Sequence, residues 1–329
     1  MSLTPQSLMS RADLATPWAI RVAATLRIAD LIAAGIRTVP DLAAKSGADT
    51  DALHRLLRYL ACRDVFTESE PGRFGLTESA ELLRSDHPLA MRDWFDLEGA
   101  GGRMDRAFTA LLEVVRTGNP GYPVVHGRSL WEDTDDSYNE LMGKHTRFAV
   151  PSLVEGYGWN EVRTVVDVGG GSGTVLQALA LAHPQLSGTV VDLPDAARAA
   201  GESFAAAGLA SRCTAVAGDF FQPLPAGADV YLLTWVLHDW PDVDAERILA
   251  RCAEAAGSQG RVVVVENLDS GTRPEVATAM DLRLLVLFGG RERTPAQLDD
   301  CAATAGLRRL SARQLPGASP VWLVEYAAR

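Results

Sequence analysis

The sequence has few of the features that mark exported, metal-binding or membrane proteins. Its 329 residues include only four cysteines. They lie far apart, with no Cys-x-x-Cys pair and no Cys/His cluster, which argues against a disulfide framework and a zinc site. The N-terminus lacks a basic start followed by an apolar core, and charged side chains interrupt the apolar stretch 14–34. We therefore expect no metal, no export signal and no membrane anchor, and a reducing cytoplasm fits best.

Excess positive charge is absent as well. The net charge is -11 and the isoelectric point is near 5.1. Nucleic acids and anionic membranes select basic surfaces, so neither is expected as a partner. With 47% hydrophobic and 22% charged residues, the chain has the composition of a soluble globular protein, and it is long enough for two domains.

The first part of the chain, residues 1–92, reads as a small domain of helices and one hairpin. A helix is expected from Thr38 to Gly47 and a second over 52–62, capped by Asp49 or Thr50. Short strands at 65–67 and 73–76 flank the turn signal Glu-Pro-Gly. Helix, turn, helix and hairpin make a winged helix.

A winged helix can bind DNA, but the charge of this one argues against it. Residues 1–95 contain eleven Lys or Arg against twelve Asp or Glu, whereas a groove-reading helix normally sits in a basic field. The stretch 15–34 carries more alanine, leucine and isoleucine than so small a domain can easily cover. We therefore predict a homodimer formed through these N-terminal helices.

The second segment, 93–160, is helical and rich in large side chains. Aromatic residues and methionine at helical spacing are most often core, yet a cleft for a flat aromatic ligand needs the same types. We expect this segment to do both. The predicted acceptor-binding residues are Trp94, Met142, Phe148 and, later in the chain, Met280.

The third segment, 161–329, alternates strands and helices. Strands are expected at 164–168, 188–192, 214–217, 229–235 and 261–266, with Ala-rich helices between them. This βαβ series predicts an α/β fold with a doubly wound parallel sheet. Two strand-like runs, 307–314 and 321–326, end the chain around a turn and add one antiparallel strand.

A glycine cluster follows the first of these strands, in the motif Asp-Val-Gly-Gly-Gly-Ser-Gly at 167–173. Glycines at a strand end let the backbone turn sharply and approach a ligand. A dinucleotide fingerprint would need glycine where Thr174 stands, and no Lys-Ser/Thr follows as in a phosphate-binding loop. The remaining pattern is that of an S-adenosylmethionine loop, with a merely structural turn as the alternative.

Potentially functional groups end the other strands, where open α/β sheets bind ligands. Asp192 suits a ribose diol because a carboxylate accepts two hydrogen bonds at once. Asp219 and Phe220 can meet an adenine amino group and cover its ring. A helix N-cap is the alternative for either acid.

His238 follows a buried strand and precedes a Pro-initiated helix, beside the glycine loop in this topology. Histidine can take a proton near neutral pH, so His238 is the candidate general base. Glu266 and Glu292 can orient its imidazole, as the carboxylate does in a catalytic triad. A packed structural histidine and surface or N-capping glutamates are the alternatives. Of the other histidines, only His145, in the helical cleft segment, is a secondary candidate.

Five motifs in this order resemble the S-adenosylmethionine-dependent small-molecule O-methyltransferases that carry an N-terminal winged-helix dimerisation domain. They are the loop at 167–173, Val-Asp-Leu-Pro at 191–194, Gly-Asp-Phe-Phe at 218–221, Leu-His-Asp-Trp at 237–240 and Gly-Gly-Arg-Glu-Arg-Thr at 289–294. The chain looks closer to the bacterial aromatic polyketide, anthracycline and enediyne branch than to the plant one. The resemblance implies that His238 is the base flanked by Glu266 and Glu292, and it implies a cofactor site made of Asp167, Gly169, Gly171, Asp192, Leu193, Asp219, Phe220, Thr234 and Trp235.

We therefore interpret the sequence as an O-methyltransferase that moves the methyl of S-adenosylmethionine onto a phenolic hydroxyl of a polyketide-derived aromatic, leaving S-adenosylhomocysteine. Plant members place a lysine where Thr234 stands, which affects the adenine contacts rather than the reaction. One alternative is an enzyme of the same fold that performs decarboxylation or hydroxylation. The other is a ligand-sensing regulator built on the winged helix.

Overall fold

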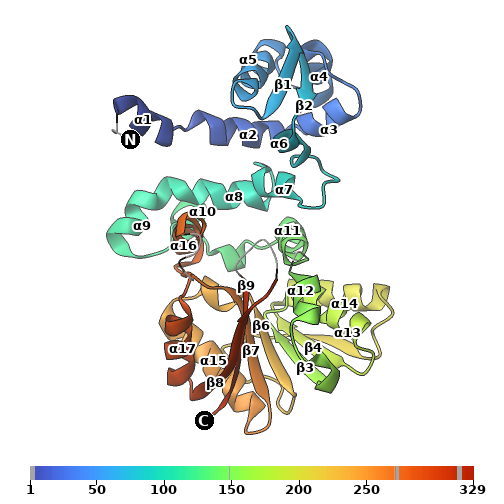
Figure 1. The fold of residues 1–329 in the computed structure, drawn as a ribbon, viewed down its shortest axis with the longest axis vertical. Coiled ribbons are helices and arrows are strands. Elements are labelled where there is room, and N and C mark those ends of the chain that lie inside the picture. The colour runs from blue at the N-terminus through green and yellow to red at the C-terminus, as the bar shows by residue number, and fades with distance from the viewer. Residues whose placement is uncertain (1–3, 148, 270, 272–273, 317–320) are drawn as a thin grey trace. The chain divides into compact units, whose positions relative to one another are not determined.

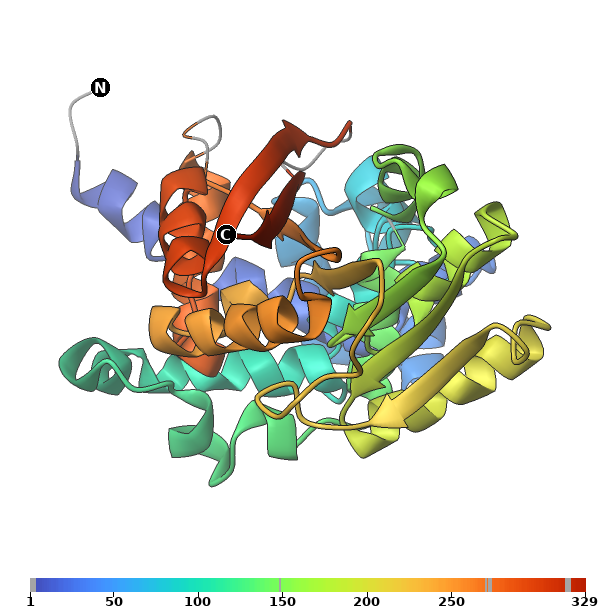
Figure 2. The ribbon, with the colours of Figure 1, turned by 90° about the horizontal axis from the view of Figure 1, so that it is seen from below.

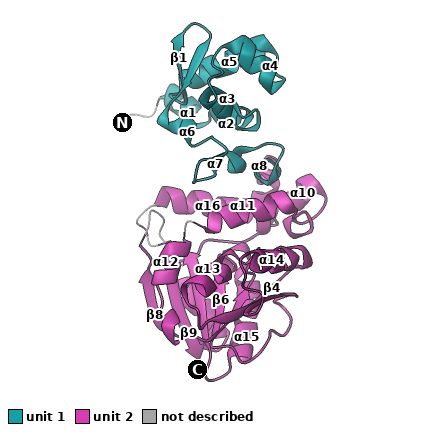
Figure 3. Cartoon of the chain, turned by 90° about the vertical axis from the view of Figure 1, so that its right-hand side faces the viewer, with its two compact units in different colours: residues 1–105 teal, residues 106–329 magenta. Residues whose placement is uncertain are grey.

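The structure is a computed structural model that describes residues 4–147, 149–269, 271, 274–316 and 321–329 (Figure 1). The chain divides into two compact units, 1–105 and 106–329 (Figure 3). The boundaries predicted after residues 92 and 160 fall inside these units and stay predictions.

Unit 1 combines short helices with one antiparallel hairpin, in the predicted order. Asp49 caps the helix over 50–61, because its carboxylate accepts a hydrogen bond from the Ala52 amide at 2.9 Å, and Leu53, Leu57 and Leu60 face the core. The elements are α1 (Pro5–Arg11), α2 (Ala15–Thr25), α3 (Ile28–Ala33), α4 (Val39–Ser46), α5 (Thr50–Ala61), β1 (Phe66–Glu70), β2 (Arg73–Leu76), α6 (Glu78–Glu81), α7 (Met91–Phe95) and α8 (Ala100–Arg106).

The apolar stretch 15–34 is largely covered within unit 1 itself. Six of its side chains are buried in the core of this unit: Ala19, Ala23, Ala24, Ile28, Ala29 and Ile32. The expectation that this stretch leaves an uncovered apolar surface is therefore wrong for these residues. The exposed large apolar side chains lie further toward the N-terminus, on α1 and at the start of α2, at Leu8, Met9, Leu14 and Trp18.

Unit 2 is built on a seven-stranded sheet with the strand order β5-β4-β3-β6-β7-β9-β8. β9 runs antiparallel to both of its neighbours, β7 and β8, as the terminal hairpin predicted. The strands are β3 (Thr164–Val168), β4 (Ser187–Asp192), β5 (Cys213–Ala217), β6 (Val230–Thr234), β7 (Arg261–Asn267), β8 (Leu307–Gln314) and β9 (Val321–Ala328). The predicted α/β, doubly wound fold class is confirmed.

Helices cover both faces of this sheet (Figure 2). Successive strand residues point to opposite faces, so Val165 joins the core beneath one helical layer and Val166 the core beneath the other. The first layer consists of α12 (Val150–Glu155), α13 (Thr174–Ala182) and α14 (Pro194–Ala206), and the second of α15 (Asp242–Ala256) and α17 (Pro295–Thr304).

Further helices of unit 2 lie at the carboxyl ends of the parallel strands (Figure 1). A Cβ on Gly143 would lie 3.2 Å from Ser172 Oγ, which places the helix carrying Gly143 directly over the glycine loop. These helices are η1 (Ala107–Ala110), α9 (Leu111–Thr117), α10 (Tyr122–His126), η2 (Leu130–Glu132), α11 (Asp136–Thr146), η4 (Leu237–Asp239) and α16 (Pro274–Phe288), whereas η3 (Trp159–Glu161) lies at the amino end of β3. The ends of the strands are thus enclosed within unit 2.

Candidate active site

The glycine loop after β3 turns through three left-handed residues. Gly169, Gly171 and Gly173 have φ values of +70°, +57° and +76°, a region that side chains other than glycine rarely adopt. A Cβ on Gly169 would lie 2.8 Å from Val236 Cγ2, and one on Gly173 would lie 2.6 Å from the Phe204 ring. A Cβ on Gly171 would meet nothing within 4 Å. Gly169 and Gly173 therefore permit close packing, whereas Gly171 faces open space that a ligand can enter.

The carboxylate of Asp192, at the end of β4, lies directly on this loop. Its Oδ2 accepts a hydrogen bond from the Gly171 amide at 2.7 Å, and its Oδ1 accepts one from the Leu193 amide at 2.7 Å. The N-cap of α14 is Leu193, with no side-chain cap. The alternative in which Asp192 serves as the N-cap is therefore wrong, and the carboxylate is directed into the site.

A second carboxyl group, Asp167, is buried beneath the loop. It is 1% exposed, and neither of its oxygens has a hydrogen-bond partner among the described residues. A Cβ on Gly170 would lie 2.5 Å from its Oδ2. Burial, and secondarily the charge of Asp192, raise the pKa of Asp167 to about 7. A carboxyl group therefore lies beneath the loop, and a nearby cation would favour its ionised form.

Residues after β5 and β6 border the same loop. Phe220 Cε1 would lie 3.5 Å from a Cβ on Gly169, and the preceding carboxylate, Asp219, accepts a hydrogen bond from the Phe221 amide at 2.9 Å. Trp235 has a φ of +50°, which is strained for a bulky residue. The Thr234 hydroxyl and the Trp235 indole N–H are buried without partners in the described structure.

His238 lies on η4, surrounded by three carboxyl groups. Its Nδ1 is 3.5 Å from Glu266 Oε2 and 3.7 Å from Glu292 Oε1, and its Nε2 is 3.5 Å from Asp239 Oδ1. Glu266 ends β7, where its Oε1 also accepts the Leu237 amide at 2.8 Å. The structure thus brings the three predicted residues, His238, Glu266 and Glu292, together, although they are up to 54 positions apart in the sequence.

The electrostatics of this cluster favour a protonated imidazole. Burial by itself lowers the pKa of His238, but the charges of Glu266, Asp239 and Glu292 outweigh burial and raise that pKa to about 10. Burial also raises the pKa of Glu266, and it raises the pKa of Asp239 to about 7 despite the opposing charge of His238. His238, Asp239 and Glu266 therefore titrate as one coupled unit.

Asp239 was missed as a site residue when the sequence was considered alone. It follows His238 directly in the Leu-His-Asp-Trp motif, and only the η4 turn brings its carboxylate back to the imidazole. His145, on α11, lies with its ring 5.3 Å from that of Trp235, and burial followed by the charge of His238 lowers its pKa.

The four predicted acceptor-binding residues are placed less fully. Met142 on α11 and Met280 on α16 are both half-buried in unit 2. Trp94 belongs to α7 of unit 1, and Phe148 lies outside the described residues. A row of aromatic rings also borders the site: Trp131 stacks at 5.8 Å on Trp240, which follows Asp239, and at 4.9 Å on Phe288.

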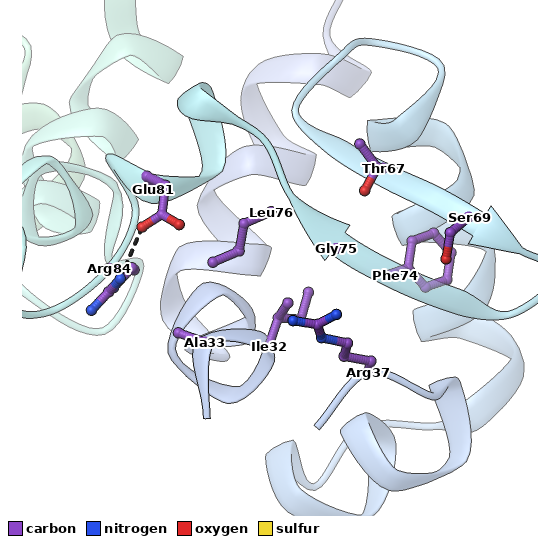
Figure 4. Close-up of a pocket in the computed structure, with 10 residues that line it drawn as sticks. All are labelled: Ile32, Ala33, Arg37, Thr67, Ser69, Phe74, Gly75, Leu76, Glu81 and Arg84. Atoms are coloured by element: carbon purple, nitrogen blue, oxygen red, sulfur yellow. Dashed lines mark hydrogen bonds and ion pairs between the residues drawn. The ribbon is translucent and has the colours of Figure 1, made fainter. Parts of the chain in front are cut away.

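Other features of the structure offer less chemistry. A hollow of about 440 Å³ in unit 1 lies between α3 and the hairpin, with the Glu81–Arg84 ion pair at its edge, and contains none of the predicted site residues (Figure 4). Within the described residues, no group of His, Cys, Asp and Glu side chains has the arrangement of a metal site, and no helix is long and apolar enough to cross a membrane.

Comparisons with known proteins agree with this geometry. Residues 108–308 match the family model of the O-methyltransferase domain, and residues 12–86 match that of the O-methyltransferase dimerisation domain. The chain is 48% identical over 327 residues to the 2,7-dihydroxy-5-methyl-1-naphthoate 7-O-methyltransferase of Streptomyces carzinostaticus, covering 98% of this chain and 97% of the relative. It is 42% identical over 322 residues to the aclacinomycin 10-hydroxylase RdmB of Streptomyces purpurascens, covering 93% and 85%.

The fold also matches a solved structure over almost its whole length. This is the crystal structure of an O-methyltransferase from neocarzinostatin biosynthesis in complex with S-adenosylmethionine and 2-hydroxy-5-methyl naphthoic acid, with a TM-score of 0.91, 48% identity and 98% of each chain covered. A doubly wound sheet with a glycine loop and a helical dimerisation domain defines the class. The chain belongs to the O-methyltransferase family, as its motifs predicted.

Proposed function

We propose that this protein transfers the methyl group of S-adenosylmethionine to a phenolic hydroxyl of a polyketide-derived aromatic molecule. The observation that carries the proposal is the imidazole of His238, held between Glu266 and Glu292 at the strand ends that also carry the glycine loop. The 48% identity to a naphthoate O-methyltransferase supports this choice of acceptor class.

The residues around the glycine loop fit this cofactor. The open space at Gly171 admits a ligand against the backbone, and Asp192 offers a carboxylate to two ribose hydroxyls. The buried, unpartnered carboxyl of Asp167 suits a cationic ligand. We assign Gly169 and Leu193 to the same site, Asp219 and Phe220 to the adenine, and the unpartnered Thr234 and Trp235 to the adjoining wall. When bound, S-adenosylmethionine supplies an electrophilic methyl group and leaves as S-adenosylhomocysteine.

His238 accepts the proton of the phenol in this proposal. Its Nδ1 faces Glu266 and Glu292, so Nε2 is the nitrogen left to receive a proton, beside Asp239. A phenol has a pKa near 10, similar to the value of about 10 for His238, so transfer to a neutral imidazole costs little free energy. A positively charged cofactor nearby would favour that neutral form, because it opposes a second positive charge.

The acceptor pocket in this proposal is aromatic. Trp131 and Trp240 offer flat surfaces for a fused ring system next to Asp239, and we assign Met142 and Met280 to the same pocket. Such side chains orient the ring, and alignment of acceptor and donor supplies much of the rate of a displacement reaction. Trp94, in unit 1, stays a prediction from the sequence.

We also propose that the protein is a homodimer. The matched dimerisation domain supports this assembly, and the exposed Leu8, Met9 and Leu14 provide apolar surface near the N-terminus.

The test is incubation of the protein with methyl-labelled S-adenosylmethionine and hydroxylated naphthoic acids as probes. We expect the label on the acceptor oxygen in amounts matching the S-adenosylhomocysteine formed. The identity to a hydroxylase makes hydroxylation or decarboxylation the second candidate. A product that gains a hydroxyl or loses carbon dioxide while the label stays on the cofactor would favour that candidate and refute methyl transfer.

A further inference from the structure

Arg293 takes no direct part in the proposed proton transfer, but it connects the chain segments that carry His238 and Glu266. Its backbone carbonyl accepts a hydrogen bond from the Asp269 amide at 3.0 Å, and it forms an isolated parallel bridge with Leu268. This pairing continues the line of β7 just beyond Glu266. Glu292 directly precedes Arg293, so both carboxylates that face His238 Nδ1 lie beside this short pairing of Leu268 with Arg293, which we call the junction.

The side chain of Arg293 reaches from the junction to the loop that carries His238. It is 3% exposed. Its Nη1 donates to the Leu237 carbonyl at 2.7 Å, and its Nη2 donates to the Trp240 carbonyl at 2.8 Å. Its Nε donates to Asp242 Oδ1 at 3.0 Å, at the start of α15. The guanidinium therefore hydrogen-bonds to the backbone on both sides of His238 and Asp239, and to the side chain of Asp242 at the start of the next helix.

The backbone just before Arg293 is in direct contact with the backbone of His238. The Arg291 amide donates to the His238 carbonyl at 2.8 Å. A Cβ on Gly290 would lie 2.2 Å from that same carbonyl oxygen, so the two segments are in direct contact. A planar guanidinium presents several donors in a rigid fork and can hold three acceptors at once, which the single ammonium of lysine cannot.

The positive charge of Arg293 also affects the pKa of Glu266 in this cluster. Several carboxyl groups and one imidazole share a buried volume there, and the charge of Arg293 opposes the rise that burial causes in the pKa of Glu266. A buried cation helps to keep the Glu266 carboxylate ionised, and an ionised carboxylate attracts a protonated imidazole.

We propose that Arg293 is a positioning residue for methyl transfer: its guanidinium fixes the 237–242 loop so that His238 stays between Glu266 and Glu292. Arg293 acts through His238 and contacts neither acceptor nor cofactor in this account. The proposal rests on the proposed function only where it names His238 as the base. The effect of the guanidinium on the position of the imidazole ring does not depend on that function.

The test compares Arg293→Lys with Arg291→Lys. Arg291 is a matched control because its side chain also pairs with Asp242, at 2.9 Å, but it is 43% exposed and meets the loop through its backbone amide, which lysine keeps. The pKa of His238 is measured by NMR on protein with 13C-labelled histidine, with the His238→Gln protein to assign its signal. The ring faces Glu266 from β7, Glu292 from the junction, Asp239 from its own loop and His145 from α11.

We expect Arg293→Lys to move the pKa of His238 from near 10 toward 6.5 by at least about 1 pH unit, since a ring released from the carboxylates loses their stabilisation. With the naphthoate probe, kcat should fall about 10- to 100-fold, as expected for misplacement by a fraction of an ångström to 1 Å, while KM and S-adenosylhomocysteine affinity stay within about twofold. Arg291→Lys should match the wild type in all of these.

A folded Arg293→Lys protein with wild-type kcat and an unchanged His238 pKa would overturn the proposal, even if it melts at a lower temperature. If this variant does not fold, Asp242→Ala takes its place, because it removes the carboxylate that anchors the guanidinium. Its kcat should fall roughly three- to tenfold with the His238 pKa lowered, by the same argument. Wild-type values there would overturn the proposal. If His238→Gln keeps full turnover, the role of His238 as the base fails, yet the NMR measurement still decides whether Arg293 fixes the position of the ring.

Discussion

Replacing His238 with glutamine tests the proposed proton transfer most directly. Glutamine is similar in length and can donate its amide N–H to Glu266 or Glu292, so the loop should keep its shape. It has no basic nitrogen, however. At about pH 7 only a fraction near 10⁻³ of a phenol with a pKa of about 10 is ionised. Because the cationic cofactor favours a neutral His238 in the wild type, a variant that depends on this fraction should lose up to roughly 10³-fold in turnover, within the usual 10²- to 10⁴-fold contribution of a positioned base.

The dependence on pH separates lost proton transfer from general damage. As the pH approaches about 10, the acceptor ionises without help, and the difference between the wild type and His238→Gln should shrink to a few-fold. The assay is the initial rate of labelled methyl transfer at saturating acceptor and cofactor across this range. Calorimetry with S-adenosylhomocysteine shows whether the cofactor site is intact.

A matched control is His183→Gln, the same substitution at the C-cap of α13, where His183 Nδ1 lies 3.2 Å from Asn160 Oδ1. We expect wild-type turnover for it. Near-normal turnover of His238→Gln at neutral pH with a true acceptor would refute the reasoning. Catalysis would then rest on the alignment of acceptor and cofactor alone.

Three further predictions concern the cofactor loop, the buried acid and the assembly. Gly171→Val should abolish S-adenosylmethionine binding in calorimetry, because its side chain enters the open space of the loop; Gly208→Val, at a similar φ of +71° and equally open, controls for backbone strain, and unchanged affinity in a folded Gly171→Val protein would contradict the loop assignment. The folded-state pKa of Asp167, about 7, exceeds its ordinary value of 3.8, so the stability linked to this group is full below the lower value and is lost as the pH rises through the higher. Asp167→Asn should therefore gain stability relative to the wild type between about pH 4 and 8 in denaturant titrations, by up to roughly 4 kcal/mol, and a constant difference across that range would count against a raised pKa. Light scattering at micromolar concentration should report a dimer, and Leu8→Asp together with Met9→Asp should weaken it; a wild-type monomer would exclude the proposed assembly.

Local sequence patterns were enough to locate the strands of the sheet. β3 and β8 have the predicted bounds, and β4, β5 and β7 differ by one residue at one end. Runs of β-branched residues that end in glycine or aspartate are strong local signals, and the βαβ rhythm then permits few topologies. The glycine loop, Asp192 and His238 could be found for the same reason, since ligands of such sheets bind at the strand ends.

Composition alone misleads about which apolar side chains of unit 1 are exposed. Counting apolar residues over 15–34 suggested a surface that needs a partner, but whether a helix face is covered depends on the helices that pack against it. Ile28 and Ile32 are 0% and 1% exposed within unit 1, whereas Leu8 and Met9, which the count left out, are 67% and 73% exposed.

The sequence by itself determined the family, the order of the elements and the side chains most suited to the chemistry, because these depend on residue type and on spacing along the chain. Only the tertiary structure decided how those side chains act together. It placed Asp239 against His238 Nε2, left both oxygens of Asp167 buried with no hydrogen-bond partner among the residues it describes, and set the guanidinium of Arg293 on the loop of His238. Each of these depends on distances of a few ångströms between segments far apart in sequence or on the exact turn of a loop, and pKa values respond to such distances and to burial rather than to residue type alone.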